Sequence, residues 1–223
     1  MGNKNHLTLI QHWQKKMSVG LACLLLCIGC SPNSSSQDTP ISDGIILYGH
    51  SLFTGWKTAS KDLSPLPVSN MAFGGSNTAQ LIEHYSEKVL HHKPRLIVLN
   101  TGVNYLKSHS VDEFEIALGE LLDLIHLTLP DAKVAWLSIT NSPRAEGSEF
   151  RKKQIAATNA AITIIKERDY VEVIDMKPFI YNDKGELIEG YFSKDKVHYN
   201  KKGYKAYTKY LKPKFEVLWK ELQ

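Results

Sequence analysis

The stretch Gly44–Leu52 reads GIILYGHSL and decides the fold, because it joins a short apolar run to a glycine and a serine. The run Gly44–Tyr48 is typical of a parallel strand that is buried on both faces. Glycine lets the backbone turn tightly after such a strand. A serine in that turn exposes its hydroxyl above the edge of the sheet, close to backbone N–H groups. Gly-x-Ser is common, so Ser51 is a candidate nucleophile only if other residues supply its partners.

Further apolar runs alternate with helical segments along the rest of the chain. The other predicted strands are Pro67–Met71, Arg95–Asn100, Lys133–Leu137 and Tyr170–Ile174. The predicted helices run from Asn77 to about Val89, from Ser110 to Pro130, from Phe150 to Arg168 and from Lys202 to Leu222. This alternation predicts one doubly wound α/β domain, residues 44–223, with a parallel sheet. In such a sheet, ligands bind beyond the carboxyl ends of the strands.

Local signals support two of these helices and qualify a third. Asn77 stands three residues before Gln80, and Ser110 stands three residues before Glu113. That spacing is typical of a capping box, in which the two side chains satisfy backbone N–H groups at a helix start. Pro213 is expected to bend or interrupt the last helix, because proline lacks the N–H that continues the ladder.

The N-terminal region predicts an export signal rather than part of the fold. Lys15 and Lys16 precede the apolar run Met17–Ile28. This run is short for a membrane-spanning helix, which needs about 20 residues. A basic region followed by a short apolar run and small residues is typical of a secretory signal.

The end of that run carries a second signal. Residues 26–30 read LCIGC and resemble a bacterial lipobox, which implies that residues 1–30 are a lipoprotein signal peptide with Cys30 lipidated. An ordinary cleaved signal or an N-terminal anchor is the alternative. Residues 31–43 (SPNSSSQDTPISD) are predicted to form a flexible tether. We therefore expect a lipid-anchored protein of the bacterial cell envelope, at the outer membrane or facing the periplasm.

Charge and cysteine content exclude several classes of function. The formal net charge is +4, but Lys4, Lys15 and Lys16 lie in the first 29 residues, which hold no acidic residue. Without them the chain has 24 basic and 23 acidic residues, so charge gives no argument for a nucleic-acid partner. All three cysteines lie in the N-terminal region, so we predict no disulfide, cysteine-based metal site or cysteine nucleophile in the domain.

Polar residues also follow other predicted strands. Gly74 and Gly75 follow the second strand and could bring a backbone N–H close to a ligand oxygen, although a phosphate-binding turn or a plain loop is the alternative. Asn104 follows the third strand and can donate an amide hydrogen bond. Asp195 and His198 stand three residues apart, a spacing at which a carboxylate can hold an imidazole in one tautomer.

Taken in order, the blocks around Ser51, Gly75, Asn104 and His198 resemble the SGNH (GDSL-like) hydrolases, over residues 45–218. Residues 138–144 (SITNSPR) and the run ending in Asp-Lys-Val-His at 195–198 resemble the branch related to platelet-activating-factor acetylhydrolase. The resemblance implies a flavodoxin-like three-layer α/β/α sandwich, in agreement with the alternation of strands and helices.

The resemblance also implies a role for each block. Ser51 would be the nucleophile, His198 the general base and then the general acid, and Asp195 the residue that orients His198. The oxyanion hole would consist of the backbone N–H groups of Ser51 and Gly75 and the side-chain amide of Asn104. Serine needs an adjacent base and the oxyanion needs pre-aimed donors, so this set requires no metal or organic cofactor.

Two residues are candidate substrate contacts. The family usually has Asp where this chain has His50, and the change either weakens the geometry of the loop or adds a second imidazole near the site. Arg144 follows a predicted strand and could contact a substrate anion, a solvated loop arginine being the alternative.

The expected function is hydrolysis of carboxylic esters through an acyl-enzyme intermediate. Small acyl groups on a small molecule or a glycan are the first expectation for the substrate, and a lipid ester is the alternative. Transfer of the acyl group to a carbohydrate by the same triad is a second hypothesis. A third is a catalytically inactive lipoprotein that binds a glycan or a partner, because a fold does not by itself imply an activity.

Overall fold

The computed structural model describes residues 42–223. The predicted signal peptide, the lipidation site Cys30 and nearly all of the predicted tether therefore lie outside the described residues and stay predictions. Within residues 42–223, no helix is both long enough and apolar enough to cross a membrane.

Five parallel strands form one sheet in the order β2-β1-β3-β4-β5. The strands are β1 (Ile45–Gly49), β2 (Val68–Asn70), β3 (Leu96–Asn100), β4 (Lys133–Leu137) and β5 (Val171–Ile174). All five predicted strands are present, and their ends agree with the prediction to within one residue. The continuous apolar runs are the reason, because strands covered on both faces need apolar side chains on both sides.

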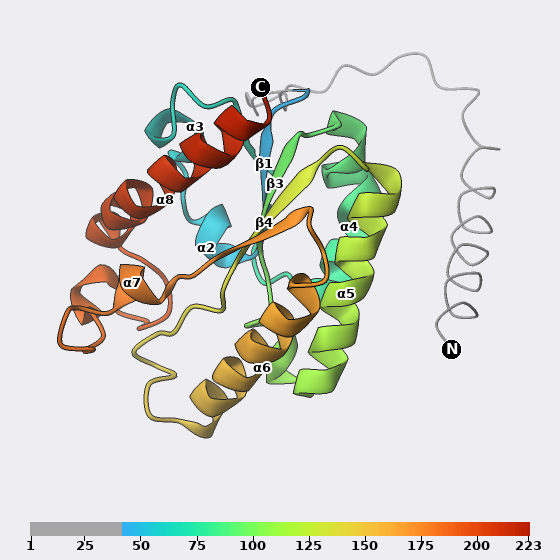
Figure 1. Cartoon of the computed structure of the whole chain (residues 1–223). Helices are drawn as coiled ribbons and strands as arrows, with labels where there is room; N and C mark the ends of the chain where they lie inside the picture. Colours follow the sequence, from blue (N-terminus) through green and yellow to red (C-terminus); the bar gives the residue numbers. More distant parts are fainter. Residues whose placement is uncertain (1–41) are drawn as a thin grey trace, which may run out of the picture. The chain divides into compact units, whose positions relative to one another are not determined.

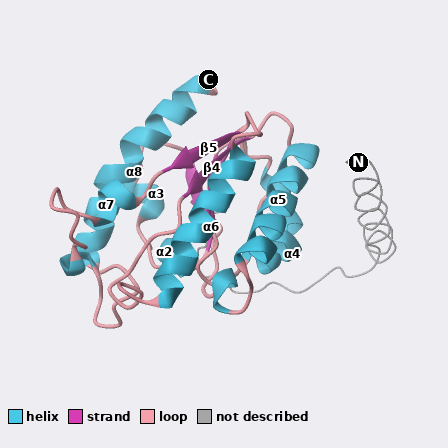
Figure 2. Cartoon of the chain, turned by 60° about the horizontal axis from the view of Figure 1, so that its bottom comes forward, coloured by secondary structure: helices cyan, strands magenta, loops and turns pink. Residues whose placement is uncertain are grey.

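Helices cover both faces of the sheet (Figure 1). One face carries α4 (Thr78–Lys88), α5 (Val111–Thr128) and α6 (Glu149–Ile165). The other carries α2 (Ser51–Thr54), α3 (Ala59–Asp62), α7 (Lys177–Ile180) and α8 (Lys201–Glu221). Figure 2 shows the two groups of helices on opposite sides of β4 and β5. Short 3₁₀ turns follow α4, β3 and α7, at Leu90–His92, Tyr105–Lys107 and Glu189–Tyr191.

The side chains of β1 show how the sheet divides the core. Ile45 and Leu47 pack with the α2, α3, α7 and α8 side, whereas Ile46 and Tyr48 pack with the α4, α5 and α6 side. All four are fully buried. Successive side chains of a strand point to opposite faces, so an unbroken apolar run supplies two cores at once. The predicted three-layer α/β/α sandwich is confirmed.

The predicted capping boxes are present at both helix starts. Asn77 accepts from the Gln80 backbone N–H at 3.0 Å, while its own N–H donates to the Gln80 side chain at 3.1 Å. Ser110 and Glu113 form the same pair of bonds. The prediction for Pro213 was wrong as far as interruption goes, because α8 continues through it to Glu221.

The order of the strands creates a switch point between β1 and β3. The chain leaves β1 for β2 on one side and then returns to β3 on the other side. Gly49 pairs with Asn100 at the carboxyl ends of these two strands. A Cβ on Gly49 would overlap the Asn100 carbonyl oxygen, so only glycine permits this close approach. Doubly wound sheets bind ligands at such a switch point. Ser51 lies there, two residues after Gly49.

Candidate active site

Ser51 is the first residue of α2, immediately beyond the end of β1. His50 is the helix N-cap, with an extended backbone, and its Nδ1 accepts from the Leu52 N–H at 3.5 Å. Leu52 and Phe53 are buried and attach the short helix to the sheet. Ser51 itself is half-buried, so its hydroxyl stands at the surface of a well-anchored turn.

The loop of Asp195 and His198 is ordered by its own carboxylate. Asp195 Oδ1 accepts from the backbone N–H groups of Val197 and His198 at 2.9 and 3.0 Å. Asp195 Oδ2 lies 2.6 Å from His198 Nδ1. The hydrogen bond from the His198 ring, followed by those from the two backbone N–H groups, holds the pKa of Asp195 well below its usual range. The carboxylate is therefore ionised and accepts from Nδ1–H.

His198 joins this loop to Ser51. Its Nε2 lies 2.8 Å from Ser51 Oγ, across 147 residues of sequence. Because Nδ1 donates its hydrogen to Asp195, the lone pair of the neutral ring is on Nε2 and faces the serine hydroxyl. The three predicted triad residues thus form one hydrogen-bonded series, a geometry that can remove the proton from Ser51 as it attacks.

Ser76 links the three segments that carry the predicted oxyanion donors. Asn104 Nδ2 donates to the Ser76 carbonyl at 3.0 Å, and Ser76 Oγ donates to the Gly49 carbonyl at 3.0 Å. An amide nitrogen carries two hydrogens, so Asn104 keeps one for a ligand. Gly75 has φ +77°, in the left-handed region, and a Cβ there would meet open space.

The backbone N–H groups of Ser51 and Gly75 complete the set. Within residues 42–223 neither N–H donates to a protein acceptor. Together with the Asn104 amide they can stabilise negative charge on an oxygen bound beside Ser51.

Lys107 is a residue that sequence reasoning missed. Its Nζ donates to Asn104 Oδ1 at 2.8 Å, on the side of the amide opposite the donating nitrogen. The signal in the sequence is only a lysine three residues after Asn104, at the end of a 3₁₀ turn, where a surface lysine is ordinary.

His50 faces the protein interior. Its side chain is 3% exposed. Burial lowers the pKa of His50 to about 4, with smaller contributions from the charges of Lys107 and His198 and an opposing hydrogen bond to Asn100. The imidazole is therefore neutral and supports the turn that carries Ser51. A substrate contact of His50 stays a prediction.

Arg144 is exposed, on the loop that follows β4. Its backbone N–H donates to the Lys196 carbonyl at 3.2 Å, which joins this loop to the loop of Asp195 and His198. A substrate contact of Arg144 stays a prediction.

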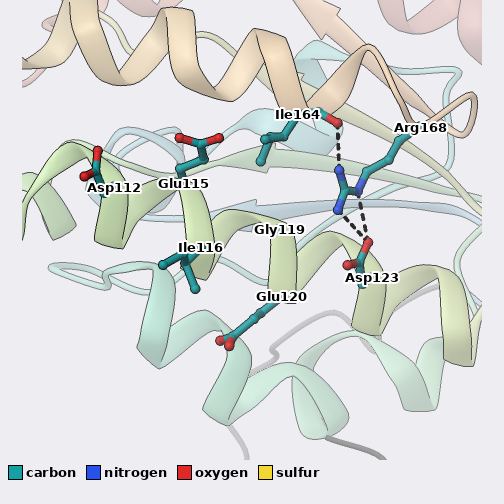
Figure 3. A pocket seen from close by; sticks show the side chains of 8 residues that line it. All are labelled: Asp112, Glu115, Ile116, Gly119, Glu120, Asp123, Ile164 and Arg168. Carbon is teal, nitrogen blue, oxygen red and sulfur yellow. Dashed lines mark hydrogen bonds and ion pairs between the residues drawn. The ribbon is translucent and has the colours of Figure 1, made fainter. Parts of the chain in front are cut away.

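Two hollows differ in their relation to Ser51. A cavity of about 10 Å³ is lined by His50 and Leu52, the two neighbours of Ser51, and by Asn100, Thr101, Val103, Ile139 and Thr140. A hollow of about 510 Å³ lies between α5 and α6 (Figure 3). Arg168 spans part of it and pairs with Asp123 at 2.9 Å. None of the predicted site residues lines the larger hollow, so size does not identify the site here.

The described part of the chain holds no group of three or more His, Cys, Asp or Glu side chains arranged to bind a metal ion.

Known proteins resemble this chain in sequence pattern and in fold. The model of the GDSL-like lipase/acylhydrolase family matches residues 38–206. A GDSL-like lipase from Bacteroides thetaiotaomicron is similar in structure, with TM-score 0.67 and 19% identity over 79% of this chain and 89% of that chain. An acetylxylan esterase from Geobacillus stearothermophilus has TM-score 0.59 and 14% identity, over 77% of this chain and 94% of that chain. At these identities the likeness shows the fold alone. No curated protein sequence matches the chain.

Proposed function

Because the chain belongs to the GDSL-like lipase/acylhydrolase family, we propose that it is a serine hydrolase that cleaves carboxylic esters of small acyl groups. The observation that carries this proposal is the hydrogen-bonded series from Asp195 through His198 to Ser51, with distances of 2.6 and 2.8 Å. A serine hydroxyl is a weak nucleophile without a base, and this series supplies a base already oriented toward it.

Each residue has a defined part in the proposed reaction. Ser51 Oγ attacks the ester carbonyl while His198 Nε2 takes its proton, and Asp195 stabilises the imidazolium that forms. The carbonyl oxygen becomes an oxyanion and accepts from Ser51 N–H, Gly75 N–H and the Asn104 amide. The C–O bond to the alcohol then breaks, and His198 gives the proton to the leaving oxygen.

The acyl-enzyme is resolved by the same groups. Water attacks the acyl carbon on Ser51 while His198 takes one of its protons. The second tetrahedral intermediate collapses, the acid leaves, and the proton returns from His198 to Ser51 Oγ. No bond in this cycle needs a metal or an organic cofactor.

The surroundings of Ser51 support a short acyl group on a large or polar alcohol. The cavity beside Ser51, at about 10 Å³, has room for roughly one water molecule. Gly74, Gly75 and Asp195, by contrast, are exposed. An open rim accepts an ester carried on a glycan, and one protein of the same fold is an acetylxylan esterase. Lipid esters are the alternative that a substrate panel would test.

The activity can be tested with p-nitrophenyl acetate. We expect release of p-nitrophenol by the parent, and a loss of at least about a thousandfold in kcat/KM for Ser51→Ala. Ser60→Ala, at an exposed position of α3, is the matched control and should equal the parent. Equal rates for the parent and Ser51→Ala would reject the proposal. Capture of the acetyl group by an added sugar, in place of water, would reassign the protein as an acyltransferase.

We also propose that the protein is anchored in the bacterial cell envelope through a lipid on Cys30. The support is the order of Lys15 and Lys16, the apolar run and the sequence LCIGC at 26–30. Mass spectrometry of the mature protein would detect an acylated Cys30 as its first residue. A mature chain that begins at Ser31 without lipid, or at Met1, would reject the anchor.

A further inference from the structure

We infer that the ester substrate carries an anionic group, a carboxylate or a phosphate, close to the ester that is cleaved. This inference rests on the proposed function and narrows its substrate class. Its basis is a set of four exposed cationic side chains on the loops that hold the site: Lys107, Arg144, Lys194 and Lys196. We call them the cationic rim.

Lys107 is the member whose relation to the site is most direct. Its Nζ lies 2.8 Å from Asn104 Oδ1, and Asn104 is a proposed oxyanion donor. The charge of Lys107 also contributes to the lowered pKa of His50, the residue next to Ser51. An anion near the oxyanion hole would therefore be attracted by the ammonium group of Lys107.

The other three members gather beside the triad from two loops. Lys194 and Lys196 flank Asp195 in sequence. Lys196 has φ +59°, and its carbonyl accepts from the Arg144 N–H at 3.2 Å. This bond holds the loop after β4 against the loop that carries His198, so three positive charges lie on adjoining segments.

These charges are not neutralised by the protein. None of the four forms an ion pair with another residue of 42–223. Two carboxylates, Asp195 and Glu146, lie on the same loops and keep their negative charges, so these loops carry four positive charges against two negative ones.

The rim also departs from the charge of the whole domain. Outside the N-terminal region the chain has 24 basic and 23 acidic residues. The excess of cations is therefore local to this edge of the sheet. Exposed positive charges on the loops around a site attract an anionic ligand and steer it to that site.

Two sources supply such an anion beside an acyl ester. One is an O-acylated sugar acid, whose carboxylate lies on the same ring as the ester. The other is an acyl ester on a phosphorylated alcohol, in a lipid or a polymer. Both present a negative charge a few ångströms from the carbonyl, so the rim recognises their shared chemistry.

The test uses substrate pairs in which one member carries an anionic group and the other does not. The first pair is O-acetylated galacturonic acid and O-acetylated galactose, and the second is an O-acetylated methyl glucoside with and without a 6-phosphate. We expect kcat/KM roughly tenfold higher for the charged member of at least one pair, because several exposed charge contacts of modest strength act together. The pair that shows the preference identifies the source of the anion.

Salt and variants show whether the rim is responsible. The preference should fall as salt rises from about 50 to about 500 mM, because exposed charges are screened. Arg144→Gln and the double variant Lys194→Gln with Lys196→Gln should bring the ratio toward one. Lys166→Gln, at the end of α6 and so at the opposite edge of the sheet, should leave the ratio as in the parent.

Two results would overturn the inference. Equal kcat/KM for the charged and neutral members of both pairs would do so, provided that the parent hydrolyses p-nitrophenyl acetate. A preference that persists in the rim variants would remove these residues from the role. Failure to hydrolyse any ester, including p-nitrophenyl acetate, would instead reject the proposed function on which the inference rests.

Discussion

Lys107 holds the amide of Asn104 by its oxygen, with Nζ 2.8 Å from Oδ1, while the Ser76 carbonyl holds the same amide by its nitrogen at 3.0 Å. The two bonds fix the plane of the amide and therefore the direction of its second N–H. The ammonium group of Lys107, which donates to the amide oxygen, also draws electron density from the amide nitrogen. The remaining N–H of Asn104 is therefore a stronger donor. The amide is thus prepared before any charge develops on a substrate.

This relationship predicts graded losses of kcat. Asn104→Ala should lower kcat for p-nitrophenyl acetate by about 100- to 1,000-fold, the usual effect of removing one oxyanion donor. Lys107→Met should lower it by roughly tenfold, because the donor remains but is less well held. Lys153→Met is the control, since Lys153 Nζ donates to the nearby Leu106 carbonyl at 2.8 Å without touching Asn104. Equal losses for the two lysine variants would show that Lys107 acts only through packing.

Asp195→Asn tests whether the carboxylate sets the tautomer of His198. An amide at this position can present N–H to the ring, which moves the ring hydrogen to Nε2 and leaves no lone pair for Ser51. We expect kcat to fall by a factor on the order of 10,000 with little change in Tm. Asp183→Asn, an exposed change in the loop after α7, should behave as the parent. A loss below about tenfold for Asp195→Asn would assign the orientation of His198 to other groups.

The pH dependence of the rate follows from the same pair. The pKa of Asp195 is held well below its usual range by its hydrogen bonds, so this carboxylate stays ionised across the working range. The rate should rise with pH, because only a neutral imidazole can accept the proton of Ser51. Stopped assays from about pH 5 to pH 8 would measure this rise, and a flat profile would contradict a histidine base.

The long elements of this fold could be predicted because each has a strong local signal. The strands are unbroken apolar runs, and α4 and α5 begin with capping boxes. The four-residue helices α2, α3 and α7 could not be predicted, because they are too short to show a period. Side-chain contacts hold these short helices in place. In α3, for example, Asp62 accepts a hydrogen bond from Trp56 Nε1 at 2.8 Å. Pro213 is tolerated in α8 because Leu211 and Phe215 on either side of it are fully buried and keep the helix on the sheet.

The site divides in the same way. Ser51, Asn104 and His198 could be predicted from the sequence. Ser51 and Asn104 follow predicted strands, and all three stand in the order of the family's sequence blocks. The burial of His50 could not, since its surroundings include Asn100, which lies 50 residues away in sequence and on the neighbouring strand. Lys107 was missed for a related reason, because nothing in a sequence distinguishes a lysine that binds an amide from a solvated one.

Gly49 and Gly119 provide a matched pair for stability. A Cβ on Gly49 would overlap the Asn100 carbonyl oxygen, which belongs to the backbone and cannot move aside. A Cβ on Gly119, within α5, would lie 3.7 Å from Arg168 and 3.9 Å from Ile164, ordinary contact distances. Gly49→Ala should therefore lower the free energy of unfolding by about 2 kcal/mol or more. Gly119→Ala should raise it by up to about 1 kcal/mol through helix propensity. Urea unfolding measures both, and a Gly49→Ala protein as stable as the parent would contradict the close approach of β1 and β3.

His50 makes the stability of the domain depend on pH. In the unfolded chain its imidazole titrates near the ordinary value of about 6.5, whereas burial lowers the pKa of His50 to about 4 in the fold. Between these values the unfolded chain binds a proton that the folded protein refuses, so stability falls as the pH falls through this window. The groups facing the ring from neighbouring elements act in both directions: the charges of Lys107 and His198 favour the neutral form, and the Asn100 hydrogen bond favours the protonated form.

The loss attributable to His50 from about pH 6.5 to about pH 4 amounts to about 3 kcal/mol. His50→Gln removes the titrating group, so its free energy of unfolding should fall by that much less than the parent's over the same window. His91→Gln, at an exposed histidine, should keep the dependence of the parent. The low pKa of Asp195 contributes only below this window, because a depressed carboxylate loses its stabilising effect as the pH falls below its unfolded value. If the free energy of unfolding varied with pH in the same way for the parent and His50→Gln, the buried imidazole would be protonated in the folded state. Its Nδ1 could then no longer accept from the Leu52 N–H.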